Sequence, residues 1–219
     1  MADSYPILAA LMTGFISGLL LSIPVGPVNL TIMNEGAQRG FKWAALIGVG
    51  ASLMEVIYCA LAFTGFATAF NSGYWKEAME FVSFAFMLVW GLKFLLIKSI
   101  PKAGKEGRFE KRLHPTSAFA TGVVRVMGNP GVFLFWIVLG IYFIAHAWVK
   151  PTWSSKGACV AGVAMGTSLW FFGLSYAVSL GHKKFTDKTL LRMERGSGIG
   201  LLVLALGHGV QILWELHKG

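Results

Sequence analysis

The chain alternates between long apolar runs and short polar or basic stretches. The runs are close to the ~20 residues that a helix needs to cross a bilayer, and they lack the alternating ten-residue strands of a membrane barrel. Read in windows of about 19 residues, the pattern predicts six apolar segments, at residues 7–33, 43–70, 78–97, 117–148, 157–180 and 197–216. We therefore expect an all-α integral membrane protein with six transmembrane helices.

The composition agrees with a membrane protein. Hydrophobic residues make up 55% of the 219 residues and charged residues 13%, and the mean hydropathy is +0.64. These values lie outside the range of water-soluble domains. The six segments use nearly the whole chain, so we expect a single transmembrane transporter domain over residues 1–219. Cys-His metal spacing, Gly-rich phosphate loops and catalytic-triad patterns are absent from the sequence, and we therefore expect no enzyme, no cofactor and no bound metal.

Basic residues gather in loops on one side of the expected bundle. The formal net charge of +9 would favour nucleic acid as the partner of a soluble protein, but Lys and Arg cluster in the loop of residues 98–116 and in the stretch of residues 183–195. Arg39 and Lys42 fall on the same side. Loops rich in Lys and Arg stay in the cytoplasm. The pattern therefore predicts that both termini lie outside, and that the bilayer, not nucleic acid, is the partner.

Weak internal similarity divides the chain into two halves. The motif G-x-S-L occurs at Gly50–Leu53 and again at Gly166–Leu169. We expect a first half of about residues 1–97, a basic cytoplasmic loop at 98–116 and a second half of about 117–219. Because each half contains three spans, an odd number, the two halves would be inverted repeats, which place a substrate site near the membrane midplane.

The first apolar segment contains the sequence S-I-P-V-G-P-V-N, from Ser22 to Asn29. Proline lacks a backbone N–H and frees a carbonyl in the preceding turn, which is costly in hydrocarbon unless a polar group satisfies it. Pro24 and Pro27 therefore predict a helix break that Asn29, Ser22 or a substrate would stabilise. A packing kink is the simpler alternative.

The fourth segment repeats the arrangement, because Asn129 precedes Pro130 there. Two polar breaks in corresponding spans favour a substrate site. Glu55 lies about twelve residues into the second segment, hence about 18 Å deep and near the bilayer centre. A carboxylate at that depth must be protonated, paired or facing a wet cavity. A structural ion pair with Arg125 and a role in coupling transport to protons are both open.

Cys59 and Cys159 are both expected toward the outer face. A pair of membrane thiols can pass electrons across a bilayer, so a transmembrane thiol-electron carrier is an alternative function. Neither cysteine is in a C-x-x-C motif, which favours simple packing.

Four motifs, in this order along the chain, resemble the LysE/RhtB family of bacterial amino-acid exporters. Ser22–Asn29 resembles the P-G-P-N signature, and Gly48–Tyr58 resembles a glycine-rich stretch with Glu55 at the acidic position. Gly122–Pro130 resembles the element ending in Asn-Pro, and Gly166–Trp170 resembles part of the fifth span. The resemblance implies a six-helix secondary transporter in the bacterial inner (plasma) membrane, which exports amino acids or related small solutes, most simply by proton antiport with alternating access.

The expected substrate and coupling site combines these motifs. Its residues are Ser22, Pro24, Pro27, Asn29, Glu55, Tyr58, Arg125, Asn129, Pro130 and Trp170. Broken-helix N-termini and Arg125 would hold a carboxylate, whereas Glu55 would hold an ammonium group or take the proton. The chain departs from the family pattern at Val25, Met54 and Gly131, so the resemblance does not name the amino acid.

Three other readings stay open: the thiol carrier, a divalent metal-ion exporter, and a membrane protein with a structural or assembly role. Small-residue helix faces also leave a homodimer open.

Overall fold

The computed structural model describes residues 4–66, 74–99, 117–180 and 187–218, and these residues form helices joined by turns, with no strand among them. Most of the basic loop at 98–116 lies outside the described residues. The helices are α1 (Ser4–Ser22), α2 (Pro27–Arg39), α3 (Phe41–Leu61), the short π-helix η1 (Ala62–Phe66), α5 (Tyr74–Leu95), α7 (Ala118–Met127), α8 (Pro130–Ala145), α9 (Trp153–Ser179) and α10 (Asp187–Lys218).

Several of these helices have the length and apolar composition of membrane spans. Within the described residues, three stretches qualify: Tyr5–Ser22, Phe41–Thr64 and Trp153–Ser179. Together, α7 and α8 would make a fourth span, bent by 66° at its break, and α5 carries a shorter apolar stretch, Phe81–Leu95. The all-helical class is confirmed, whereas the count of six spans and the inverted repeats stay predictions.

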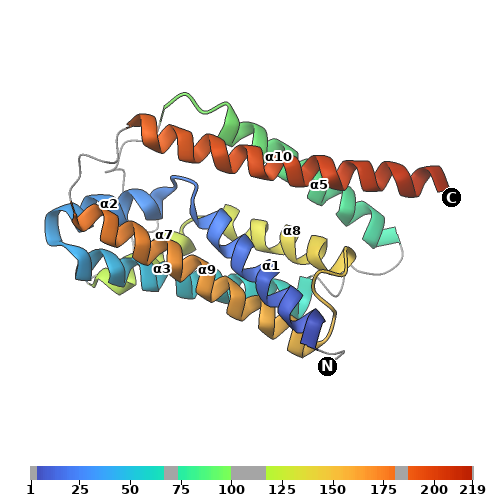
Figure 1. Ribbon diagram of the computed structural model, residues 1–219, viewed down its shortest axis with the longest axis horizontal. Helices are drawn as coiled ribbons and strands as arrows, with labels where there is room; N and C mark the ends of the chain where they lie inside the picture. Colours follow the sequence, from blue (N-terminus) through green and yellow to red (C-terminus); the bar gives the residue numbers. More distant parts are fainter. Residues whose placement is uncertain (1–3, 67–73, 100–116, 181–186, 219) are drawn as a thin grey trace.

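The helices form two groups that α8 joins. α5 and α10 lie side by side and antiparallel along one side of the molecule (Figure 1). In the other group, α1 packs along α9, and α3 packs against both α7 and α9. α8 contacts α3 as well as α5. The N-terminal end of α1 and the C-terminal end of α10 lie at the same end of the molecule (Figure 1).

Glycines bring the helix backbones of the larger group into direct contact. A Cβ atom on Gly14 would overlap the carbonyl oxygen of Cys159, and one on Gly162 would overlap that of Leu11, so α1 and α9 approach closely. Gly122 plays the same part where α7 crosses α3. Small residues are the usual means of helix association in a membrane, because no hydrophobic driving force separates apolar helices from lipid.

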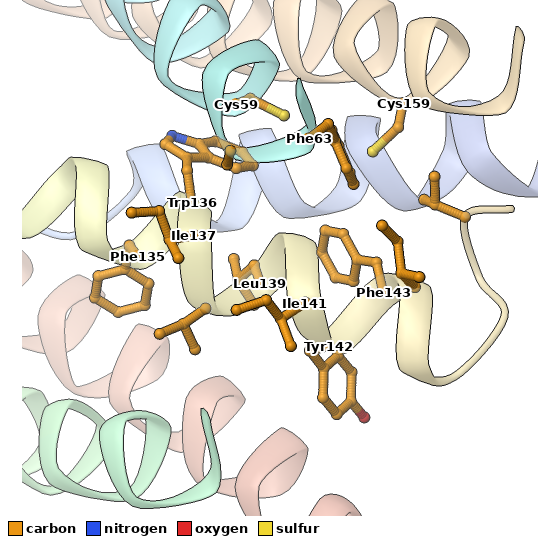
Figure 2. Close-up of a cluster of buried hydrophobic side chains, with 14 of the residues drawn as sticks. Cys59, Phe63, Phe135, Trp136, Ile137, Leu139, Ile141, Tyr142, Phe143 and Cys159 are labelled. Atoms are coloured by element: carbon orange, nitrogen blue, oxygen red, sulfur yellow. The ribbon is translucent and has the colours of Figure 1, made fainter. Parts of the chain in front are cut away.

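α8 is the central helix of the core. Every residue from Phe135 to Ile144 is buried, and a helix that is apolar on all sides belongs in a protein interior. Figure 2 shows its side chains pointing in all directions, with Trp136 toward α3 and Tyr142 on the opposite side. This buried part of α8 begins at Phe135, five residues after the proline that starts the helix.

Candidate functional site

The break between α1 and α2 is closed by one asparagine. Pro27 occupies the first turn of α2, where backbone N–H groups have no partner within the helix. The missing N–H of the proline therefore costs no helical hydrogen bond. The Asn29 amide donates to the carbonyl oxygens of Ser22 and Pro24, both at 2.7 Å. These carbonyls lie at the end of α1 and in the break, where the regular helical pattern stops. The Ser22 hydroxyl instead donates to the Gly18 carbonyl oxygen at 2.8 Å.

Trp170 links this break to α9. Its indole Nε1 donates to the side-chain oxygen of Asn29 at 3.2 Å. Both ends of the Asn29 amide are therefore engaged, and the side chain is 3% exposed. Trp170 positions Asn29 and is not itself among the residues that line the neighbouring cavity.

A carboxylate from α10 satisfies the backbone N–H of the same break. The N–H of Val25 donates to Glu194, which is 5% exposed. Lys93 of α5 interacts electrostatically with that carboxylate. Sequence reasoning missed Glu194 because it stands between Arg192 and Arg195, in a stretch that we interpreted as a basic loop. The available signal was an acidic residue directly before the sixth apolar segment.

The second break, between α7 and α8, is built differently. α7 ends at Met127, α8 begins at Pro130, and the chain turns by 66° between them. The N–H of Asn129 donates to the Val126 carbonyl oxygen at 3.0 Å. Asn29 follows its proline and closes the first break from within α2, whereas Asn129 precedes its proline and stands at the N-cap position of α8 without a capping hydrogen bond from its side chain. The two breaks therefore differ in their chemistry.

Glu55 is buried in the second half of α3, with 7% of its surface exposed. The side chain of Trp136, from the central helix α8, hydrogen-bonds to it. Tyr58 lies one turn further along α3, where its ring packs on Phe133 with 5.0 Å between the centroids. The burial of Glu55 places a titratable group where α3 meets α8.

A cavity of about 550 Å³ lies where these elements meet. Its volume falls within the range of about 300–1,000 Å³ that is typical of small-molecule sites. Six of the ten residues expected from the sequence line it: Ser22, Pro24, Pro27, Asn29, Glu55 and Asn129. The other four, which are not among its lining residues, are Tyr58, Arg125, Pro130 and Trp170. Four further lining residues come from α5 and α10 and were not expected: Trp90, Lys93, Phe94 and Glu194.

The two cysteines meet away from this cavity. Cys59 of α3 and Cys159 of α9 are both free and buried, and their thiols interact. Figure 2 shows them near Phe63, on the α3 side of α8. The sequence placed both toward the outer face without bringing them together. Over the described ranges, no group of three His, Cys, Asp or Glu side chains is arranged to hold a metal ion.

Comparison with known proteins gives a consistent set of matches. The family model described as LysE type translocator matches residues 19–211. The chain is similar to the putative amino acid efflux protein YcgF of Bacillus subtilis (strain 168), with 26% identity over 201 residues. The matched stretch covers 91% of this chain and 94% of that protein.

Two further similar proteins carry the name arginine exporter protein ArgO. The protein from Salmonella enteritidis PT4 (strain P125109) is 28% identical over 171 residues, 74% of either chain. The protein from Pectobacterium carotovorum subsp. carotovorum (strain PC1) is 27% identical over 175 residues, 78% of this chain and 81% of its own. No solved structure matches.

Proposed function

The chain belongs to the LysE type translocator family, and we propose that it exports amino acids or related small solutes from the cytoplasm. The family match confirms the resemblance that the motifs carried. The observation that carries the proposal is the shared cavity, because residues of both helix breaks and the buried Glu55 line one space. Irregular backbone at membrane depth is tolerated where it lines such a cavity. Broken helices of this kind form the substrate sites of secondary transporters.

The proposal includes two inverted halves. Ser52 and Ser168 are 116 residues apart and occupy the same position in the two G-x-S-L motifs, and their hydroxyls are 3.2 Å apart. Equivalent residues touch each other only next to a symmetry axis, so this contact supports a pseudo-two-fold axis between α3 and α9. The packing of α1 on α9 and of α7 on α3 supports the same relation. Alternating access would then be a rocking of one half against the other around the cavity.

The substrate's two charged groups have partners in the cavity. The first turn of α2 borders it through Pro27 and Val28, and the partial positive charge of a helix N-terminus favours a carboxylate. Glu55 takes the ammonium group. We assign the carboxylate to the α2 N-terminus instead of Arg125, because Arg125 is not among the lining residues.

Glu55 also couples export to protons in this proposal. The ionised carboxylate attracts the ammonium group when the cavity faces the cytoplasm. When the cavity faces outside, a proton neutralises Glu55, the attraction is lost and the substrate leaves. The proton is then carried inward on the return step, which makes the cycle an antiport.

The orientation in the membrane follows from the charges. The N-terminal end of α1 and the C-terminal end of α10 lie toward one end of the molecule, and the turn from α2 into α3, which carries Arg39 and Lys42, lies at the other end (Figure 1). With basic residues in the cytoplasm, both termini lie outside the bacterial inner membrane.

Export from loaded cells tests this function. Cells without their own exporters are loaded with mixed dipeptides, and every amino acid that appears outside is followed for wild type, Glu55→Gln and an empty vector. We expect one or a few amino acids to leave faster with wild type, and we expect Glu55→Gln to remove the excess. Glu35→Gln is the matched control, because Glu35 pairs with Arg39 at 3.1 Å and does not line the cavity.

Two results would contradict the proposal. Coincident profiles for wild type and the empty vector would exclude amino-acid export. Proton-dependent export by Glu55→Gln at the wild-type rate would leave export intact and exclude Glu55 as the coupling group.

The thiol-electron carrier remains the second candidate, because Cys59 and Cys159 interact. The sequence contains only these two cysteines, so a relay would have to work with a single pair. Removing both thiols separates this function from export.

A further inference from the structure

A second hollow, which we call the α1–α10 groove, lies between the two helix groups and has no role in the transport scheme above. Its volume is about 900 Å³, and α1 and α10 line its two sides while α8 borders it through Leu139 and Phe143. Its polar side chains are Thr13, Ser17 and Ser197. The hydroxyls of Thr13 and Ser197 donate to carbonyl oxygens of their own helices. The groove therefore offers little to a polar solute and suits an apolar occupant.

Two glycines keep this groove open. Gly196 and Gly200 line it, and a Cβ atom on either would meet no other atom within 4 Å. Gly198, between them, is different, because its Cβ would lie 2.6 Å from the backbone nitrogen of Leu95 where α10 packs on α5. Glycine inside a helix is destabilising relative to alanine, and an unfilled void deprives its walls of packing contacts. Glycines that only enlarge a void indicate that another molecule fills it.

The dimensions of the groove match one lipid chain. Its lining residues on α10 run from Met193 to Leu204, eleven residues that span about 16 Å. One leaflet of a bilayer has a hydrocarbon thickness of about 15 Å, half of the ~30 Å core. The other wall of the groove is α1, one of the stretches long and apolar enough to cross a membrane. An acyl chain is therefore an apolar molecule of the right length in the right place.

Basic residues stand at one end of the groove. Lys188 and Arg192 are exposed, and they precede the lining residue Gly196 on α10 at intervals of four, which puts them on the same helix face. The one acidic residue between Lys188 and Gly196 is Glu194, which is buried and accepts from the Val25 N–H instead. α10 begins at the end of the molecule where α2 lies (Figure 1), which is the cytoplasmic end in the proposed orientation. Basic residues between helices on that side bind anionic lipid headgroups.

We propose that the α1–α10 groove binds an anionic phospholipid of the inner leaflet, with one acyl chain between α1 and α10 and the headgroup phosphate at Lys188 and Arg192. The charge of the phosphate complements these two side chains, and the chain fills the space that Gly196 and Gly200 leave open. The lipid thereby joins the helix group of α1 and α9 to the pair of α5 and α10. This site is independent of the exported solute and uses only the orientation proposed above.

Photolabelling with a lipid tests the site directly. The full chain in detergent micelles is irradiated with phosphatidylglycerol that carries a diazirine near the end of one acyl chain, and mass spectrometry locates the labelled residues. We expect the label at the end of the groove remote from Arg192, near Phe143 and Leu204. Unlabelled phosphatidylglycerol should compete at a concentration about 25-fold lower than phosphatidylcholine, since each basic residue near the membrane surface strengthens binding of anionic lipid by about fivefold.

Three variants divide the site into its parts. Lys188→Gln combined with Arg192→Gln should bring the competition ratio close to one and leave the labelled position unchanged. Gly200→Leu should remove the label from the groove, because the leucine side chain occupies the space of the acyl chain. Gly207→Leu is the matched control, since Gly207 lies on the same helix, has no neighbour within 4 Å and does not line the groove. It should be labelled like wild type.

Several results would overturn the proposal, and none of them depends on transport. Label spread evenly over the exposed faces of α1, α9 and α10, or unchanged in Gly200→Leu, would show ordinary contact with the bilayer. Equal competition by the two lipids in wild type would exclude the headgroup site at Lys188 and Arg192. A dimer that excludes the label and dissociates in Gly200→Leu would assign the groove to a second copy of the chain. The charge variants change exposed positions, so their result stands even if Gly200→Leu does not fold.

Discussion

Asn29 is the side chain whose loss should disturb this fold most directly. Its amide holds the carbonyl oxygens of Ser22 and Pro24, and its oxygen holds the indole N–H of Trp170. Asn29→Ala would leave three polar groups without these partners in a region where the asparagine is 3% exposed. An unsatisfied buried group costs about 1–3 kcal/mol. Taking the low end of that range, because the cavity admits water, the substitution should destabilise the protein by about 3 kcal/mol.

The two native cysteines make this loss measurable. Cys59 and Cys159 are 1% and 0% exposed, so a thiol-reactive dye reports unfolding of the purified protein on heating. At about 2–4 °C per kcal/mol for a chain of this size, the melting temperature should fall by about 6–12 °C. Asn29→Asp should fall as well, because a carboxylate cannot donate to either carbonyl.

Asn34→Ala is the control for this measurement. Asn34 is on the same helix and exposed, and its side chain accepts a hydrogen bond from the Gln38 amide at 3.0 Å. Melting of both Asn29 variants within about 2 °C of wild type, which corresponds to about 0.5–1 kcal/mol, would refute the claim that this amide closes the break.

Three further predictions concern other contacts of the molecule, two measured by melting and one by export. Trp170→Phe keeps an aromatic ring and removes the indole donor to Asn29, so the melting temperature should fall by about 2–4 °C. A loss as large as that of Asn29→Ala would contradict the smaller share assigned to this one hydrogen bond. Gly162→Ala should cost about 1–3 kcal/mol because its Cβ would overlap the α1 backbone, whereas Gly173→Ala on the same helix has no neighbour within 4 Å and should melt at or above the wild-type temperature. A variant in which Cys59 and Cys159 are both replaced by Ala should export at the wild-type rate in the loaded-cell assay. Loss of export in this variant would favour the thiol-electron carrier.

The sequence alone determined the membrane class and the positions of the helix breaks. Both properties are local. A bilayer requires apolar residues over a fixed length, and a proline removes a backbone donor wherever it stands. The stretch from Ser22 to Asn29 therefore predicted a break, with Asn29, Ser22 or a substrate as the group that would stabilise it. Only the structure shows that Asn29 holds the free carbonyls. Glu55 was found because a carboxylate at bilayer depth is costly without a compensating environment.

Only the tertiary structure decided which side chains share the cavity. Tyr58 lies on α3 together with the lining residue Glu55, and Arg125 lies on α7 shortly before the lining residue Asn129. Neither Tyr58 nor Arg125 lines the cavity. Glu194 and Lys93 do line it, although the sequence placed Glu194 in a basic stretch and did not single out Lys93 as a site residue. The meeting of Cys59 with Cys159 was equally absent from the pattern. The physical reason is that hydropathy fixes how deep a residue lies, whereas the rotation and tilt of each helix, set by its packing against the others, decide which way that residue faces.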